Sequence, residues 1–185
     1  FLTLFLPERA NDVSLYEGYE PLFDEYVIEE EITRALSRKV PLPSGGHLVI
    51  DQGEALTAID VNTGRFTGNG RDVEQTILQT NLEAVREISY QLLFRNIGGL
   101  IVLDFIDMER AGNRDKVYKA LLRELKKDKS KTSAVRISEL GLVEMTRKRT
   151  HESLGRLLSE PCFYCDGTGS LKSNTSVCHE IFRQI

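Results

Sequence analysis

The stretch GGLIVLDFIDMER, residues 98 to 110, carries the strongest prediction about the fold. A run of apolar residues ends in Asp104, and a second carboxylate, Asp107, follows three positions later. Continuous apolarity is typical of a central strand that is covered on both faces. A buried carboxylate is costly unless something pairs with it or coordinates it. The acid at the tip of this strand therefore indicates either a turn or a bound cation.

The segments around this strand predict a mixed sheet with helices packed on it, an α/β fold of the α+β kind. The runs HLVID and ALTAIDVN are typical of an antiparallel pair. A long helix is expected from Asp72, with Gln75 in the capping-box position, to a stop at Asn96. Its core-facing positions recur at helical spacing: Ile77, Asn81, Ala84, Val85, Ile88 and Leu92.

Further elements are expected on both sides. Residues 1–40 predict a short strand or two and then a helix around IEEEITRALSRK. A second helix is expected near residues 113–130, then strands around AVRIS and LVEMT and a short helix near 151–158. The segment PLPSGG, residues 41–46, is the predicted boundary because it combines two prolines with two glycines.

Composition excludes some classes of protein. Of 185 residues, 41% are hydrophobic and 28% are charged, which is typical of a globular chain with a core. No apolar stretch approaches the roughly 20 residues that a bilayer span needs, so we expect no membrane span. The net charge of −4 argues weakly against a nucleic-acid binder, but the segments KKDKSK (126–131) and RKR (147–149) are locally basic. Net charge therefore decides little.

The acids at the strand ends are the candidate site. Asp60 and Asn62 lie two positions apart, so both side chains leave the same face of an extended strand. If the strand that ends at Asp104 is a neighbour, these groups meet at one edge of the sheet, where α/β proteins place ligands. Two adjacent carboxylates repel each other unless a cation lies between them, and Mg²⁺ prefers such oxygen ligands. We interpret Asp107 and Asp51 as turn, capping or supporting residues.

Spacing alone also fits a simpler interpretation. Asp and Asn are common where strands stop, because their side chains satisfy the backbone of turns. A serine triad has poorer support, since the three histidines are scattered and no serine stands in an elbow motif. A P-loop is absent as well.

Cysteine spacing predicts a metal knuckle near the C-terminal end. In SEPCFYCDGTGS, Cys162 and Cys165 have the spacing of half a tetrahedral zinc site. The other two ligands would be Cys178 and His179 of the same chain, or a second copy of the pair across a two-fold axis. Three cysteines with one tight pair suit a reducing compartment and a metal better than a disulfide framework.

Several long motifs, taken in order, resemble the catalytic core of the ribonuclease E/G family. They are SGGHLVIDQGEALTAIDVNTGRF, TNLEAVREISYQL, GGLIVLDFIDM, GLVEMTRKRTHESL and EPCFYCDGTG, and the resemblance covers about residues 14 to 172. It implies a DNase I-like catalytic domain, and it favours the metal interpretation of the acids over the turn interpretation.

The resemblance also implies roles for individual residues. Asp60 and Asp104 would hold a catalytic Mg²⁺ and Asn62 would orient them, so that a metal-activated water attacks the scissile phosphate. The implied substrate is single-stranded, often A/U-rich RNA, cut to leave a 5′-phosphate and a 3′-hydroxyl in RNA processing and mRNA decay. Cys162 and Cys165 would form a zinc link that two chains share, although Phe163 replaces the family's proline.

Partners follow from the same resemblance: a homodimer through the zinc link, a tetramer as a further assembly, degradation-complex proteins, and a cytoplasmic location of the bacterial type. Lys131 stands where the family often has an arginine near the RNA 5′-phosphate, and lysine offers charge but no bidentate fork. Arg147, Lys148 and Arg149 are expected either to contact the RNA backbone or to form a solvated charged face.

The domain organisation that the resemblance implies has four parts. Residues 1–42 match the C-terminal part of a ribonuclease H-like and 5′-sensor subdomain, and residues 43–158 match the DNase I-like catalytic domain. Residues 159–170 are the zinc link, and residues 171–185 begin a small dimerisation domain. The sequence is therefore expected to be a fragment without the S1 RNA-binding domain, with weak or no turnover in isolation.

Two rival functions keep part of this pattern. A non-catalytic RNA-binding or assembly module would retain the zinc knuckle and need the acids only as caps. A metal-dependent phosphoesterase acting on DNA or small phosphates would share the fold. Cleavage of RNA distinguishes the first rival from the enzyme.

Overall fold

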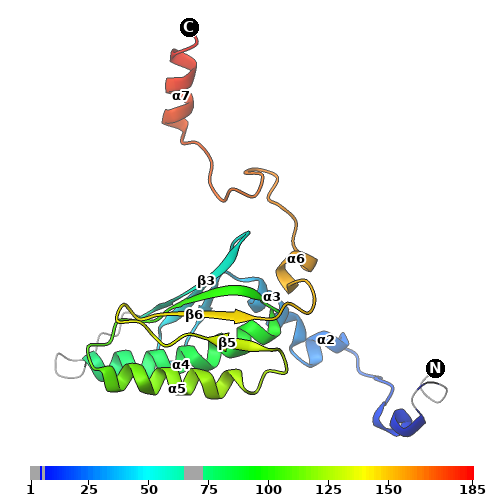
Figure 1. Ribbon diagram of the computed structural model, residues 1–185. Helices are drawn as coiled ribbons and strands as arrows, with labels where there is room; N and C mark the ends of the chain where they lie inside the picture. Colours follow the sequence, from blue (N-terminus) through cyan, green and yellow to red (C-terminus); the bar gives the residue numbers. More distant parts are fainter. Residues whose placement is uncertain (1–4, 6, 65–72) are drawn as a thin grey trace.

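The computed structural model describes residue 5, residues 7–64 and residues 73–185 (Figure 1). Within these residues the centre of the fold is a six-stranded mixed sheet with the order β1-β2-β3-β4-β6-β5. The strands are β1 (Lys39–Pro41), β2 (His47–Gln52), β3 (Leu56–Asn62), β4 (Gly99–Asp104), β5 (Thr132–Ala134) and β6 (Leu142–Arg147). Among these described strands, β3 and β4 form the parallel pair and all other neighbours are antiparallel.

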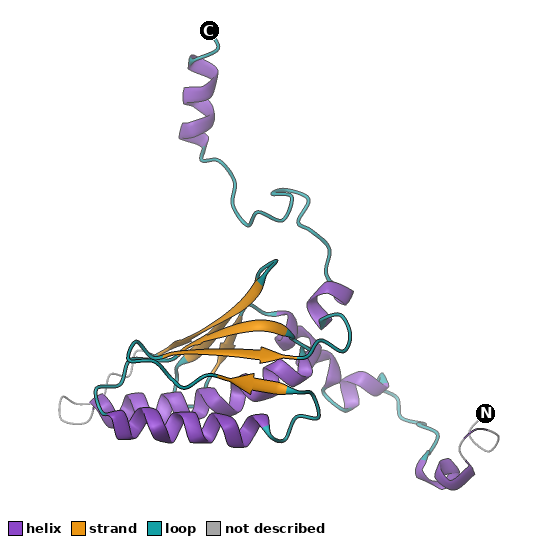
Figure 2. Ribbon diagram, in the orientation of Figure 1, coloured by secondary structure: helices purple, strands orange, loops and turns teal. Residues whose placement is uncertain are grey.

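Helices pack against one face of this sheet. The helical segments are η1 (Pro7–Asp12), α2 (Leu22–Glu25), α3 (Ile28–Leu36), α4 (Val73–Phe94), α5 (Ala111–Leu125), α6 (Leu154–Leu158) and α7 (Asn174–Phe182). Figure 2 shows α4 and α5 side by side under the sheet. The connection through α4 is what makes β3 and β4 parallel, because parallel neighbours need a crossover long enough to return the chain to the same end of the sheet.

The core lies between the sheet and the two long helices. In β4, Ile101 and Leu103 are fully buried, whereas Leu100 on the opposite face is 44% exposed. The expectation that this strand is covered on both faces is therefore wrong. The described helices cover one face, and the apolar residues Leu56 and Leu100 remain on the other, which we call the open face.

Most elements occur where the sequence predicts them. The antiparallel pair β2–β3 and the short helix α6 are confirmed, and the core positions of α4 are buried or partly buried. The predicted start of α4 at Asp72 lies outside the described residues. Strand β5 is earlier and shorter than the predicted AVRIS strand.

The N-terminal part differs from the prediction. Among the described residues before Lys39 there are helices and irregular chain but no strand. The acidic residues of this segment are mostly exposed, and the described backbone before Lys39 meets the sheet at Arg38, whose carbonyl accepts from the amide of Ile50 at 2.9 Å. Its helices therefore form from local propensity and from the contacts of α3, without a strand to align to.

The segment PLPSGG is a hairpin connection between β1 and β2. The amide of Leu42 donates to the carbonyl of Gly46 at 2.8 Å, and Gly45 adopts a positive φ of 88°. Val40 of β1 is completely buried in the core. The sheet thus begins ahead of residue 43, where the catalytic domain was predicted to start.

Residues after α6 leave the sheet. Figure 1 shows the segment that carries Cys162 and Cys165 and then α7 extending away from it. Within the described ranges, no helix combines the length and the apolarity that a membrane crossing requires.

Candidate active site

The parallel register of β3 and β4 places Asp60 directly beside Asp104. Neighbouring strands lie about 4.8 Å apart, so the two carboxylates are adjacent. Both belong to the open face, because Ile59 and Leu103 next to them point into the core. The predicted meeting of these acids is confirmed. Asp104 is exposed rather than buried, so the carboxylate ends a strand whose other face makes the core.

Asn62 holds one of the two acids in position. Its amide nitrogen Nδ2 donates to Oδ2 of Asp60 over 2.8 Å. The contact arises because residues two apart on a strand share a face. The bond orients the Asp60 carboxylate at the position beside Asp104.

Asp107, which the sequence analysis interpreted as a turn, capping or supporting residue, joins the same site. The chain leaves the strand conformation after Asp104, and Asp107 lines an open cleft of about 520 Å³ together with Asp60, Asn62 and Asp104. Gly141 makes this bend possible, because a Cβ there would lie 2.5 Å from the carbonyl oxygen of Phe105.

The electrostatics of the cleft favour a cation. Desolvation by the neighbouring protein atoms raises the pKa of Asp104, and the charges of Asp60 and Asp107 raise it further. A divalent cation between the carboxylates would relieve this repulsion, and hard oxygen ligands suit Mg²⁺. In the part of the chain that the structure describes, no group of three or more His, Cys, Asp or Glu residues is arranged to hold a metal. Water and substrate phosphate would therefore have to complete the coordination of an ion held by two carboxylates.

Asn81 of α4 fixes the loop that follows Asp104. Its side chain is fully buried, donates through Nδ2 to the carbonyl of Ile106 at 2.9 Å, and accepts from the amide of Ile106 at 3.1 Å. Sequence periodicity placed Asn81 on the core face but assigned it no role. The sequence did contain a signal for this role, namely a side-chain amide at a core position of a helix. A buried polar group of this kind needs a hydrogen-bond partner.

The basic residues at the end of β6 and just after it divide into two kinds. Arg147 is 3% exposed, its Nε lies 2.6 Å from Oδ2 of Asp128, and its Nη1 donates to the carbonyl of Ile97 at 2.8 Å. Neither expectation for Arg147, a contact with RNA or a place in a solvated charged face, fits this burial, because its guanidinium is bonded to Asp128 and Ile97 inside the fold. Lys148 is exposed, and its amide donates to the carbonyl of Lys131, so these two lysines lie close together.

Asp51 also has a definite partner. Its carboxylate accepts from Nε and Nη2 of Arg38 at 2.5 and 2.7 Å, which ties β2 to the residue before β1. The arginine holds the pKa of Asp51 below its usual range. Asp51 is thus an ion-pair residue of the sheet edge and not part of the cleft.

The cysteine pair sits in a tight turn. The amide of Cys165 donates to the carbonyl of Cys162, and the amide of Gly169 donates to Sγ of Cys165 at 3.3 Å. The second bond lowers the pKa of the Cys165 thiol and so favours the thiolate that binds metals. Cys178 and His179 lie on α7, and the described residues of one chain gather no set of metal ligands.

Comparison with known proteins decides the family. A model of the Ribonuclease E/G family matches residues 1–150. The chain belongs to the ribonuclease E/G family. All 185 residues align with Ribonuclease G of Salmonella typhimurium (strain SL1344) at 49% identity and with Ribonuclease G of Escherichia coli (strain K12) at 48%. Ribonuclease E of Haemophilus influenzae is 45% identical over 182 residues.

This ribonuclease E/G chain is short beside its relatives. It spans 38% of the length of the two Ribonuclease G proteins and 19% of the length of the Ribonuclease E protein, although 98% or more of the chain is aligned in each case. The family confirms the resemblance that the motifs indicated. The cleft of Asp60, Asn62 and Asp104 is then the candidate active site within that family.

Replacing Asn81 tests its hold on the loop. Asn81→Ala leaves both backbone groups of Ile106 without their partner, and an unsatisfied buried group costs about 1–3 kcal/mol. We expect the free energy of unfolding in urea to fall by roughly this amount. Gln79→Ala, an exposed change on the same helix, should alter it by less than about 0.5 kcal/mol. Equal effects of the two substitutions would contradict the role of Asn81.

The pKa of Asp104 makes a prediction about stability. Because the pKa of Asp104 is raised in the folded state, its ionised carboxylate destabilises the fold. This effect is absent below the ordinary pKa of about 3.9, develops as pH rises from there to the folded-state pKa, and is complete above it. In EDTA at neutral pH, Asp104→Asn should therefore raise the melting temperature, and the gain should vanish near about pH 3.

Asp115→Asn is the matched control for this measurement. Asp115 pairs with Arg136 at 3.2 Å, so loss of its charge removes an attraction and should give no such gain. Thermal unfolding followed by circular dichroism checks both variants. A lower melting temperature for Asp104→Asn at neutral pH would refute the repulsion in the cleft.

Proposed function

We propose that this chain is the catalytic core of a Mg²⁺-dependent endoribonuclease that cleaves single-stranded RNA. The observation that carries the proposal is the in-register pair of Asp60 and Asp104 with the amide of Asn62 bonded to Asp60. Membership of the ribonuclease E/G family, and the names of the Ribonuclease G and Ribonuclease E relatives, support RNA as the substrate.

The residues of the cleft divide the work. Asp60 and Asp104 would hold Mg²⁺ through carboxylate oxygens, and Asn62 keeps Asp60 from rotating away. When bound, the ion would polarise the scissile phosphate and make a nearby water more acidic. Asp107 adds negative charge that strengthens the attraction for the cation, and Asn81 keeps the loop of Asp107 in place through Ile106.

The cleft also suits a single strand as substrate. It is open, and Leu140 and Leu142 bound it on the side away from β3, so an unpaired strand can lie across the two acids. We propose A/U-rich RNA as the preferred substrate, with a 5′-phosphate and a 3′-hydroxyl as the product ends, in RNA processing and mRNA decay. Lys131, Lys148 and Arg149 would contact the RNA backbone, which gives salt-dependent affinity without sequence preference.

Assembly would use the cysteine pair. We propose that Cys162 and Cys165 provide half of a Zn²⁺ site and that a second chain provides the other half, since α7 extends away from the pair and Cys178 does not join it in the described chain. The homodimer, a tetramer built from two such dimers, contacts with degradation-complex proteins and a cytoplasmic location belong to the same proposal.

Cleavage of a labelled A/U-rich RNA tests the catalytic assignment. We expect cuts that require Mg²⁺ and that carry 5′-phosphate ends, assayed with the full-length protein. Asp104→Asn should lower the rate by at least about 100-fold, because loss of a direct ligand exceeds the effect of an outer neighbour. Asp115→Asn, which removes the same charge from α5, should leave the rate unchanged.

Two results would count against this function. Cleavage that persists in Asp104→Asn would return Asp104 to the role of a turn residue. A folded protein that binds the RNA but never cuts it would favour the rival, a non-catalytic RNA-binding or assembly module.

Removal of zinc ligands tests the dimer. Cys162→Ser with Cys165→Ser should release Zn²⁺ and convert the dimer to monomers in analytical ultracentrifugation, because a tetrahedral site needs four ligands. Cys178→Ser should keep both the metal and the dimer. Loss of zinc in Cys178→Ser would show that the site closes within one chain.

A further inference from the structure

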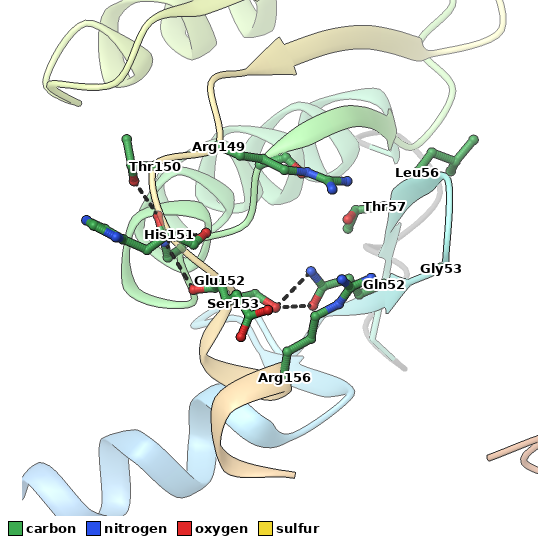
Figure 3. Close-up of a pocket in the computed structure, with 12 residues that line it drawn as sticks. Gln52, Gly53, Leu56, Thr57, Arg149, Thr150, His151, Glu152, Ser153 and Arg156 are labelled. Carbon is green, nitrogen blue, oxygen red and sulfur yellow. Dashed lines mark hydrogen bonds between the residues drawn. The ribbon is translucent and has the colours of Figure 1, made fainter. Parts of the chain in front are cut away.

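A second polar pocket lies where β3 and β4 begin, at the end of these strands opposite to Asp60 and Asp104. Its volume is about 260 Å³, and Figure 3 shows the side chains that line it. The residues on which the argument depends are Gln52, Thr57, Arg149, His151, Ser153 and Arg156. None of them belongs to the cleft of the acids.

Arg149 is held in a built position. Its Nε donates to the carbonyl of Gly98 at 3.0 Å. A Cβ on Gly98 would lie 2.8 Å from Cγ of Arg149, and a Cβ on Gly99 would lie 2.8 Å from its Nη2. Two glycines at the start of β4 therefore give this side chain the space to lie across the strand. In Figure 3 the guanidinium of Arg149 extends towards Thr57.

Arg156 reaches the pocket from α6. The hydroxyl of Ser153 exchanges hydrogen bonds with the amide of Gln52 at 3.0 and 3.2 Å, which joins the start of α6 to the end of β2. Arg156 follows on the next turn, and Figure 3 shows it beside Gln52. The two arginines thus reach the pocket from separate elements, one after β6 and one on α6.

Asn96 holds the segment of chain between Arg149 and Arg156 along the pocket. Its Nδ2 donates to the carbonyls of His151 and Glu152, both at 3.2 Å, and its Oδ1 accepts from the hydroxyl of Thr150 at 3.3 Å. The segment that carries the basic residues is therefore anchored to the end of α4. A fixed wall lowers the conformational entropy that a ligand would have to remove on binding.

The charge of the pocket is positive. Neither Arg149 nor Arg156 forms an ion pair with a carboxylate among the described residues, whereas Glu152 is the acid in the lining. A guanidinium donates hydrogen bonds and accepts none, and its fork matches the oxygens of a phosphate. The pocket therefore offers convergent donors to an anion.

We propose that this pocket binds an internal phosphate of single-stranded RNA other than the scissile phosphate. The proposal rests on the proposed function only in taking RNA as the ligand. Leu56 at the rim of the pocket and Asp60 in the cleft are about 13 Å apart along β3. One extended strand can therefore occupy both places, with its direction and distance from the metal set by the sheet.

Binding without cleavage tests the pocket. In EDTA, the full-length protein is titrated with a fluorescent single-stranded RNA that ends in a 5′-hydroxyl, and anisotropy is read at several salt concentrations. Arg149→Ala with Arg156→Ala should weaken binding by about tenfold or more, as loss of charged hydrogen bonds predicts. The slope of log affinity against log salt should fall by about 0.7, the value for one phosphate of a single strand.

The matched control is Arg86→Ala with Arg123→Ala. Both arginines are exposed on the helical layer, and the double change alters net charge equally. The control should bind RNA within about twofold of the original protein. Equal weakening by the two double variants would overturn the proposal, since net charge alone would then explain the loss.

A single substitution at an exposed residue tests the pocket with a variant that should fold normally. Arg156 is exposed and its side chain forms no hydrogen bond with a described residue, so Arg156→Glu should fold while placing a second acid beside Glu152. It should weaken RNA binding by more than Arg156→Ala. Unchanged binding by Arg156→Glu, with a normal circular dichroism spectrum, would overturn the proposal.

Comparison of RNAs with different 5′ ends, and a cleavage assay with Mg²⁺, distinguish the remaining outcomes. Weakening that is confined to a 5′-phosphorylated RNA would show a terminal-phosphate site and overturn the internal assignment. Normal Mg²⁺-dependent cleavage with unaltered binding by the pocket variants would overturn the pocket and the RNA contact of Arg149, but it would leave the proposed cleavage reaction standing. Failure of the original protein to bind RNA at all would overturn both.

Discussion

The parallel pairing of β3 with β4 is the constraint on which the rest of this structure depends. Ile59 and Ile101 face the core on these strands, and their burial against α4 and α5 holds the pair in register. A shift by one residue would turn the core residues outwards and the polar residues inwards. The register that keeps the core buried is therefore the register that sets Asp60 beside Asp104.

The crossover through α4 positions residues at both ends of the β3–β4 pair. Asn81 in α4 bonds the loop that follows Asp104, while Asn96 just beyond α4 bonds the segment that carries His151 and Glu152. Negative charge collects at the ends of the two strands and positive charge where they begin. This separation of charge suits RNA as the proposed ligand. Its phosphate backbone would meet a cation held by the acids at one end of the strands and arginines at the other end.

The cleft of acids and the sheet beneath it have different effects on stability. Desolvation of the Asp104 carboxylate and the like charges of Asp60 and Asp107 beside it raise its pKa, and both act against folding when the carboxylate is ionised. The packed side of the same strands provides the opposing free energy through buried Ile and Leu side chains. Sites that assemble like charges for a cation are expected to reduce stability in this way, and a rigid sheet is a suitable support for them.

The sequence by itself determined the elements, the spacing of Asp60 and Asn62 and the family, because periodicity and motifs depend on residues near one another in the chain. Tertiary structure decided which face of β4 is open and that Asp107 lines the cleft. It also decided that the guanidinium of Arg147 is bonded to Asp128 and to the carbonyl of Ile97 inside the fold. Those outcomes follow from the order of strands and from contacts between distant segments. A local sequence pattern predicts neither the strand order nor the contacts between distant segments. Only the folded chain therefore shows which charged side chains remain available for chemistry.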